Sequence, residues 1–288
     1  MRNRIYTCLF FVFAFFYNQE LFAQQGDYLS AEVGMGLGAA HYFGDLNTST
    51  KLNRPKPAAT LFFRKYLGRY IAARVGFSFA QLGYSDIYNK NNAVQLRRNL
   101  SFNTNVWEVS AQGDFHFFKF LPQERGLNFT PYITLGAGLF SYDPYAYLNN
   151  ERYYFRELPV GTEGQNSPLY PDRKMYGTTA LSIPFGGGFK YSIAGGRLNL
   201  SFEVLHRFTN TDYLDDVSTT YIDPSTYKNN GFEGTQYFDA LEMNNREITK
   251  FSVPGSKRGN PSNKDSYFSF NLKVGISLNS LMGGGYSY

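Results

Sequence analysis

An alternation of apolar and polar side chains between Arg197 and Arg207 restricts the folds open to this chain more than any other feature. The stretch reads R-L-N-L-S-F-E-V-L-H-R, with Leu198, Leu200, Phe202 and Val204 alternating with Asn199, Ser201 and Glu203. A period of two places the two sets on opposite faces of a single β-strand. One face of this strand therefore needs an apolar environment and the other a polar one.

Similar stretches recur along the chain, and we expect eight strands in all. Their approximate ranges are Leu29–Ala40, Pro57–Lys65, Tyr70–Ala80, Trp107–Phe117, Phe129–Phe140, Leu181–Ile193, Arg197–Arg207 and Phe268–Leu278. Charged residues make up only 18% of the chain, whereas aromatic residues also reach 18%. Such a composition favours lipid outside the strands, with aromatic side chains at the two membrane interfaces.

The lengths of the connections support this interpretation, because short and long connections alternate. The short ones lie near Gly68, across Pro122–Gly126 and at Gly195–Gly196, and the long ones span Asp45–Lys56, Ser85–Leu100, Tyr142–Thr179 and Thr209–Asp265. Bacterial outer-membrane barrels have an even number of strands, short periplasmic turns and long extracellular loops. The predicted fold is therefore all-β: an eight-stranded antiparallel transmembrane β-barrel with long extracellular loops and short periplasmic turns.

The inward-facing positions separate this fold from a soluble lipocalin-like barrel, whose lumen would be apolar. We expect a polar network in the lumen, formed by Glu32, Arg64, Arg74, Glu108, Asp114, His116, Lys190, Glu203 and Lys273. An eight-stranded barrel is only just wide enough for side chains to fill it. Charges of both signs are therefore expected to pair, because an unpaired buried charge costs several kcal/mol. Conduction of solutes is the alternative.

The N-terminus has the order of a secretory signal peptide: Arg2 and Arg4, an apolar run from Ile5 to Tyr17, and a cut expected after Ala23. Residues 1–23 are the predicted signal peptide and residues 24–288 a single barrel domain. Cleavage would remove Cys8, the only cysteine, and lower the formal net charge from +5 to +4. This mild, dispersed charge does not suggest a nucleic-acid partner, and we expect no cofactor and no small-molecule substrate.

Two histidines leave an enzymatic alternative open. His41 and His206 have outward parity near the outer rim, where a barrel-type lipid A deacylase would carry a catalytic histidine with a serine and an acidic partner. No partner set with recognisable spacing accompanies them, so histidines at the membrane interface are the simpler interpretation. We therefore expect no enzyme activity.

An acidic loop leaves a second alternative open. Asp212, Asp215, Asp216 and Asp223 lie within the stretch T-D-Y-L-D-D-V-S-T-T-Y-I-D-P. Several carboxylates could hold Ca²⁺. However, the spacing is not that of an EF-hand, and aspartate is common in turns because it hydrogen-bonds nearby backbone N–H groups.

Several motifs resemble a family of Bacteroidetes outer-membrane barrels, the PorG-like family of the type IX secretion system. They are Gly44-Asp45-Leu46, Arg98-Asn99-Leu100-Ser101-Phe102 with Trp107-Glu108, Thr130-Pro131-Tyr132, Pro184-Phe185-Gly186-Gly187-Gly188, Thr211 to Val217, and Arg258-Gly259-Asn260-Pro261. Together they extend over nearly the whole mature chain. The stretch Tyr213-Leu214-Asp215-Asp216 and the Gly259-Asn260-Pro261 segment are the more specific ones.

The resemblance implies a non-catalytic outer-membrane component of a protein-export apparatus. In gliding species the same apparatus also serves motility. Its implied partners are outer-membrane lipid and a periplasmic ring of the PorK–PorN type. The short turns, together with a Gly-rich tail from Ser280 to Tyr288, would form the surface that contacts this ring. A paralogue acting as a narrow channel or a surface-binding barrel is the alternative.

Overall fold

The computed structural model describes residues 31–48, 51–122, 124, 126–247 and 249–278. The predicted signal peptide, residues 1–23, and the tail from Ser280 to Tyr288 lie outside the described residues. Two residues of the turn expected at Pro122–Gly126, Gln123 and Arg125, also lie outside them.

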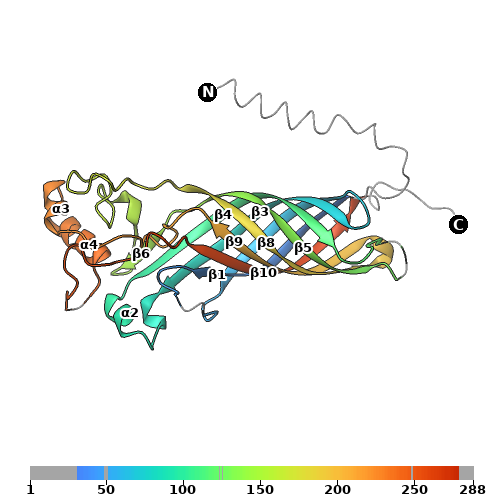
Figure 1. Cartoon of the computed structure of the whole chain (residues 1–288), viewed down its shortest axis with the longest axis horizontal. Coiled ribbons are helices and arrows are strands. Elements are labelled where there is room, and N and C mark those ends of the chain that lie inside the picture. Colours follow the sequence, from blue (N-terminus) through green and yellow to red (C-terminus); the bar gives the residue numbers. More distant parts are fainter. Residues whose placement is uncertain (1–30, 49–50, 123, 125, 248, 279–288) are drawn as a thin grey trace, which may run out of the picture.

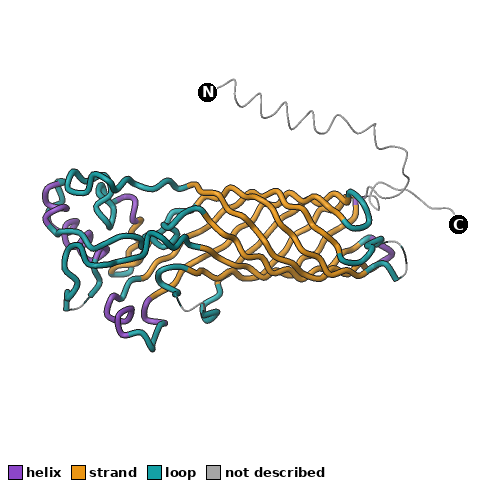
Figure 2. Tube along the Cα trace, viewed as in Figure 1, coloured by secondary structure: helices purple, strands orange, loops and turns teal. Residues whose placement is uncertain are grey.

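Eight long strands form a closed antiparallel barrel (Figures 1 and 2). They are β1 (Ala31–Phe43), β2 (Lys56–Tyr66), β3 (Ile71–Ser85), β4 (Ser101–His116), β5 (Phe129–Ser141), β8 (Thr179–Ile193), β9 (Leu198–Thr209) and β10 (Ser266–Ser277). The order is β3-β2-β1-β10-β9-β8-β5-β4, and the pairing of β3 with β4 closes the sheet. The predicted fold class is confirmed.

The outer face of the barrel is apolar, as the alternation predicts. Phe202 is 41% exposed and Leu272 is 69% exposed, and these two residues pair with each other on neighbouring strands. Further exposed apolar side chains surround the barrel, among them Val33, Leu61, Phe77, Val109, Leu135, Phe185 and Val274. Of the outward positions on the eight barrel strands, only Lys65 carries a permanent charge, close to the short turns. A face of this kind belongs in the hydrocarbon core of a membrane.

The β3–β4 hairpin extends further than expected. The sequence predicts strands ending at Ala80 and beginning at Trp107, whereas pairing continues to Ser85 opposite Ser101. The apolar alternation stops here because the outward positions of the extension, such as Gln81 and Asn103, are polar. The inward positions of this extension, Leu82, Tyr84 and Phe102, are buried against the loops.

The four long connections fold into an ordered assembly, here called the loop cap, at one end of the barrel (Figure 1). It contains the helices α2 (Ala93–Arg98), α3 (Ser225–Asn229) and α4 (Gly234–Asn244), the hairpin β6 (Tyr145–Leu148) and β7 (Glu151–Tyr154), and the 3₁₀ helices η2 (Asp86–Tyr88) and η3 (Phe155–Glu157). The hairpin continues the sheet through a pairing of Asn103 with Tyr145. The sequence predicted only loops here.

The short connections occupy the opposite end, with the 3₁₀ helix η4 (Ala194–Gly196) between β8 and β9. Gly195 has a φ of +65° and Gly196 a φ of +88°, which favours glycine at both positions of this tight turn. Within the described residues, no helix combines the length and apolarity needed to cross a bilayer.

Candidate functional site

The bore holds all nine polar residues that the sequence predicts for it, and each is at most 3% exposed. Nearest the short turns, Arg64 joins two carboxylates: its Nη1 lies 3.1 Å from Glu32 Oε1, and its Nε lies 2.8 Å from Asp114 Oδ2. Lys190 Nζ lies 3.1 Å from His116 Nε2 in the same layer. This layer therefore brings together five of the predicted residues from four different strands.

A second layer crosses the middle of the bore. Arg74 Nη1 lies 2.6 Å from Glu203 Oε2, and Lys273 forms an ion pair with the other oxygen of Glu203. Arg74 also lies 3.8 Å from Asp114, which links this layer to the first. Tyr132 donates a hydrogen bond to Glu203 over 2.8 Å.

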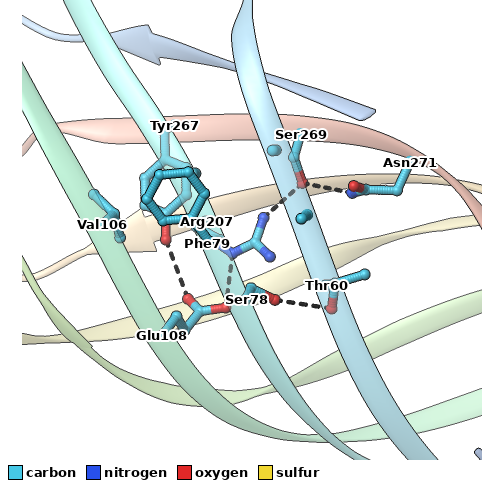
Figure 3. A pocket seen from close by; sticks show the side chains of 12 residues that line it. Thr60, Ser78, Phe79, Val106, Glu108, Arg207, Tyr267, Ser269 and Asn271 are labelled. Atoms are coloured by element: carbon cyan, nitrogen blue, oxygen red, sulfur yellow. Dashed lines mark hydrogen bonds and ion pairs between the residues drawn. The ribbon is translucent and has the colours of Figure 1, made fainter. Parts of the chain in front are cut away.

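The third layer lies towards the loop cap and is centred on Glu108 (Figure 3). Glu108 Oε1 lies 2.9 Å from Arg207 Nε, while Oε2 accepts hydrogen bonds from Ser182 (2.8 Å) and Tyr267 (3.2 Å). Arg207 also donates to Ser269 Oγ over 2.8 Å. All the charged side chains of this layer are therefore paired.

Arg207 and the buried tyrosines Tyr66, Tyr132 and Tyr267 also lie in the bore, beyond the nine residues predicted from the sequence. The parity of β9 identifies Arg207, which follows Asn199, Ser201 and Glu203 on the inward face. The tyrosines also have inward parity, but aromatic side chains are equally expected at membrane interfaces, so sequence alone does not separate the two locations. The hydroxyl groups of Tyr66 and Tyr267 hydrogen-bond the carboxylate oxygens of Glu32 and Glu108 that the basic residues leave free, whereas Tyr132 shares Glu203 Oε2 with Arg74.

The bore is nearly full. Two cavities, each of about 10 Å³, lie among Thr60, Ser78, Arg207 and Asn271, which line both of them. A cavity of this size holds roughly one water molecule. Phe120 packs over Lys190 and His116 at the short-turn end, and the buried core of the loop cap covers the other end. Neither of these two cavities has room for a solute larger than water.

The two histidines on the outward parity have different surroundings. His41 is buried rather than interfacial, because the loop after β1 covers it: its Nε2 accepts from Arg54 N over 3.2 Å, and its Nδ1 lies 2.9 Å from Tyr42 O. His206 packs against Phe43 and Phe208. In the described part of the chain, neither histidine hydrogen-bonds a serine or a carboxylate.

Four aspartates meet where the barrel joins the loop cap, and we call Asp45, Asp212, Asp215 and Asp265 the rim cluster. The Tyr42 hydroxyl hydrogen-bonds Asp215 and lies 3.1 Å from Asp265 Oδ1. Asp45 Oδ2 accepts from Asn260 N over 2.5 Å. Burial, and after it the nearby charge of Asp45, raises the pKa of Asp215 well above the ordinary aspartate value. Burial, and after it the nearby charge of Asp215, does the same to the pKa of Asp265. Burial also raises the pKa of Asp212 to about 7.

Two arginines connect the rim cluster to the rest of the loop cap. Arg98 donates to the backbone oxygens of Asp45 (2.9 Å) and Arg258 (2.8 Å) while its guanidinium forms an ion pair with Asp86. Arg258 in turn lies 2.9 Å from Glu163. Segments far apart in the sequence, around residues 45, 98, 212–217 and 258–261, thus converge at one place. These are four of the motifs on which the family resemblance rests.

The acidic stretch considered for calcium divides into separate sites. Asp216 accepts hydrogen bonds from Thr162 and Tyr176, and burial raises its pKa to about 7. Asp223 is exposed and accepts from Ser225 N over 2.8 Å, at the start of α3. Only Asp212 and Asp215 belong to the rim cluster. Across the described residues, no three or more His, Cys, Asp or Glu side chains are already arranged to hold a metal ion.

The fold and the outer face define the class: this is an outer-membrane β-barrel protein. The chain belongs to a family described as a domain of unknown function (DUF6089), whose model matches residues 4–158. No curated protein matches the chain by sequence.

Similar solved structures are also outer-membrane barrels. Ail of Yersinia pestis, in complex with the heparin analogue sucrose octasulfate, has 10% identity and a TM-score of 0.40 over 87% of this chain and 99% of Ail. The N-terminal barrel domain of Pseudomonas aeruginosa OprF has 9% identity and a TM-score of 0.35 over 88% of this chain and 99% of that domain. Neisserial surface protein A has 8% identity and a TM-score of 0.38 over 85% of this chain and 96% of that protein.

Proposed function

We propose that this protein is a non-catalytic barrel that anchors and positions a protein-secretion complex at the outer membrane, after removal of a signal peptide over residues 1–23. The observation that carries the proposal is the bore, which is filled by paired charges and closed at both ends. A barrel without a path for solutes acts through its end surfaces. The partner we propose is a periplasmic ring of the PorK–PorN type, on the basis of the sequence resemblance.

The short-turn end is the proposed contact surface. It presents Leu67 (59% exposed), Phe117 (52%) and Phe118 (54%) at the barrel rim, with Lys119 exposed beside them. Exposed apolar and aromatic side chains next to charged ones are typical of protein interfaces. Phe118 and Lys119 follow the end of β4 and begin the turn, so these two positions are the ones to alter.

Co-purification tests this proposal. The full chain is extracted from native membranes in mild detergent, and the proteins that accompany it are identified by mass spectrometry. We expect periplasmic ring proteins with the wild type, and less than about a tenth of that amount with Phe118→Asp combined with Lys119→Glu. The control is Phe238→Asp, at an aromatic residue of the loop cap that is more exposed (67%) than Phe118 (54%). Extraction without ring proteins, together with normal secretion in a deletion strain, would refute the proposal.

A surface-binding barrel is the second candidate, and the ordered loop cap favours it. Several apolar side chains on the cap are largely exposed, among them Phe238 (67%), Phe251 (66%) and Val253 (62%). Deleting α3 and α4 would abolish function if this candidate holds, whereas the short-turn variant would then have no effect. The two candidates therefore predict opposite results for the same pair of variants.

A further inference from the structure

The rim cluster brings four buried carboxyl groups together without an ion-pair partner among the described residues. The cap's other buried carboxylates have basic partners, since Asp86 pairs with Arg98, and Glu163 pairs with Arg258. Among the described residues, no basic side chain forms an ion pair with Asp45, Asp212, Asp215 or Asp265. Several buried carboxylates without cations are costly, because each loses its hydration without compensation.

Asp212 is the most unusual member of the cluster. Its side chain is 3% exposed, and neither carboxylate oxygen has a hydrogen-bond partner. Ser218 is close to it, but no hydrogen bond of normal geometry forms. Buried polar atoms in folded proteins almost always have partners, so two orphaned oxygens on one carboxylate need an explanation such as a bound ion.

The surroundings of Asp212 indicate which carboxylate would bind such an ion together with it. Its carboxylate lies within electrostatic reach of Asp45, Asp215 and Asp265. Asp215 and Asp265 are already engaged by the Tyr42 hydroxyl and by the backbone amides of Val217 and Leu214. Asp45 is less committed, because Asn260 N is the one hydrogen bond to its carboxylate in the described structure.

Gly259 brings Asp45 close to the loop that carries Asp212. A Cβ at position 259 would lie 2.6 Å from Asp45 Oδ2 and 2.6 Å from Ser218 N, so a side chain there would displace one of them. The absence of that side chain leaves room at this place for both Asp45 Oδ2 and the backbone of Ser218. The loop after β1 and the loop after β9 therefore approach each other closely beside Gly259.

We propose that Asp45 and Asp212 bind a Ca²⁺ ion, with backbone carbonyl and water oxygens completing its coordination. Two carboxylates balance the charge of Ca²⁺, so the remaining ligands can be neutral oxygens and no third acidic side chain is needed. This agrees with the described residues, in which no three or more His, Cys, Asp or Glu side chains are grouped to hold a metal ion. Ca²⁺ fits better than Mg²⁺ because it accepts six to eight oxygens in irregular geometry, whereas Mg²⁺ requires a near-ideal octahedron. The ion would join the loop after β1 to the loop after β9. This inference does not depend on the proposed function.

Limited proteolysis of the full chain in detergent micelles tests the site. Cleavage of the loop cap is compared in CaCl₂, in MgCl₂ and in EGTA. If the protease cuts only after the loop cap opens transiently, Ca²⁺ should slow cleavage by up to ~100-fold at a concentration about 100 times its dissociation constant. Mg²⁺ should slow cleavage less. Asp212→Asn and Asp45→Asn should each lose at least nine-tenths of this Ca²⁺ effect. The exposed Asp223→Asn is the matched control and should keep it.

Terbium luminescence gives a second readout that does not require equal stability of the variants. Tb³⁺, a Ca²⁺ mimic, should show emission sensitised by nearby tyrosines such as Tyr213, and excess Ca²⁺ should abolish it. Retained heat-modifiable mobility on a gel establishes that each variant barrel is folded. Absence of Ca²⁺ protection in the wild type would mean that protons alone neutralise the cluster. Equal protection in Asp212→Asn would place the ion elsewhere, and either result overturns the proposal.

Discussion

Arg74 on β3 and Glu203 on β9 meet inside the barrel at 2.6 Å, although 129 residues separate them in the sequence. Both side chains are almost fully buried. Glu203 also pairs with Lys273 on β10, so a single carboxylate contacts two basic side chains from distant parts of the chain. This contact shows why the bore specifies one closed barrel: each charge needs partners that only the correct strand order supplies.

Glu203→Gln should therefore destabilise the folded barrel by about 3–5 kcal/mol, because Arg74 and Lys273 would remain buried without their shared carboxylate. Urea titration of the folded and unfolded bands on a gel measures the change. The control is Glu242→Gln, which removes a solvent-exposed ion pair with Lys250 and should cost less than about 1 kcal/mol. Equal effects of the two substitutions would mean that the bore network adds no stability.

The outer face makes a second prediction. Leu272 is 69% exposed and pairs with Leu37 and Phe202, both apolar and outward. Leu272→Lys should destabilise the barrel in lipid vesicles by about 2–4 kcal/mol, the usual cost of a basic residue near the middle of the bilayer. Equilibrium folding into vesicles against urea tests this, with Leu272→Ile as the apolar control. A lysine variant as stable as the control would show that this face does not meet hydrocarbon.

Local alternation was sufficient to predict the barrel, because along each strand the apolar side chains face lipid and the polar side chains face the bore. Parity assigned Glu32, Arg64 and Glu203 to the bore correctly, and it identifies Arg207 by the same argument. Which charges pair was not predictable, since the Arg74–Glu203 contact depends on the stagger between strands rather than on spacing within either.

The loop cap could not be predicted in the same way. It has no periodic pattern, and its helices are short: α2 has 6 residues and α3 has 5. Such helices are stable only through tertiary contacts, as when Arg98 at the end of α2 reaches Asp86, Asp45 and Arg258. The calcium hypothesis grouped Asp212, Asp215, Asp216 and Asp223 because they lie in one loop, whereas folding separates Asp216 and Asp223 from the other two and brings Asp212 within electrostatic reach of Asp45.

The loop cap should become less stable as the pH rises when Ca²⁺ is absent. Burial and neighbouring charge raise the pKa values of Asp215 and Asp265, so the folded cap binds more protons than the unfolded chain above pH ~4. Stability is therefore highest near or below pH ~4 and falls as the pH rises towards the raised pKa values. Hydrogen exchange of residues 211–217 at pH ~5 and pH ~8, corrected for intrinsic rates, should show less protection at the higher pH. Asp215→Asn should reduce this dependence, and an unchanged dependence would locate the titrating groups elsewhere.

The guanidinium of Arg98 makes the last prediction. It holds Asp86 through two hydrogen bonds of 2.7 Å each and also reaches two backbone oxygens, of Asp45 and Arg258. Lysine keeps the charge but cannot reproduce this planar fork, so Arg98→Lys should lose about 2–4 kcal/mol of local cap stability. Hydrogen exchange should then accelerate by roughly 30-fold or more around residues 45 and 258–261, while the barrel strands stay protected. Arg97→Lys is the matched control, because Arg97 is half exposed and lies 3.6 Å from Glu247. If both variants exchanged alike, Arg98 would not be the residue that holds the first, second and fourth long loops together.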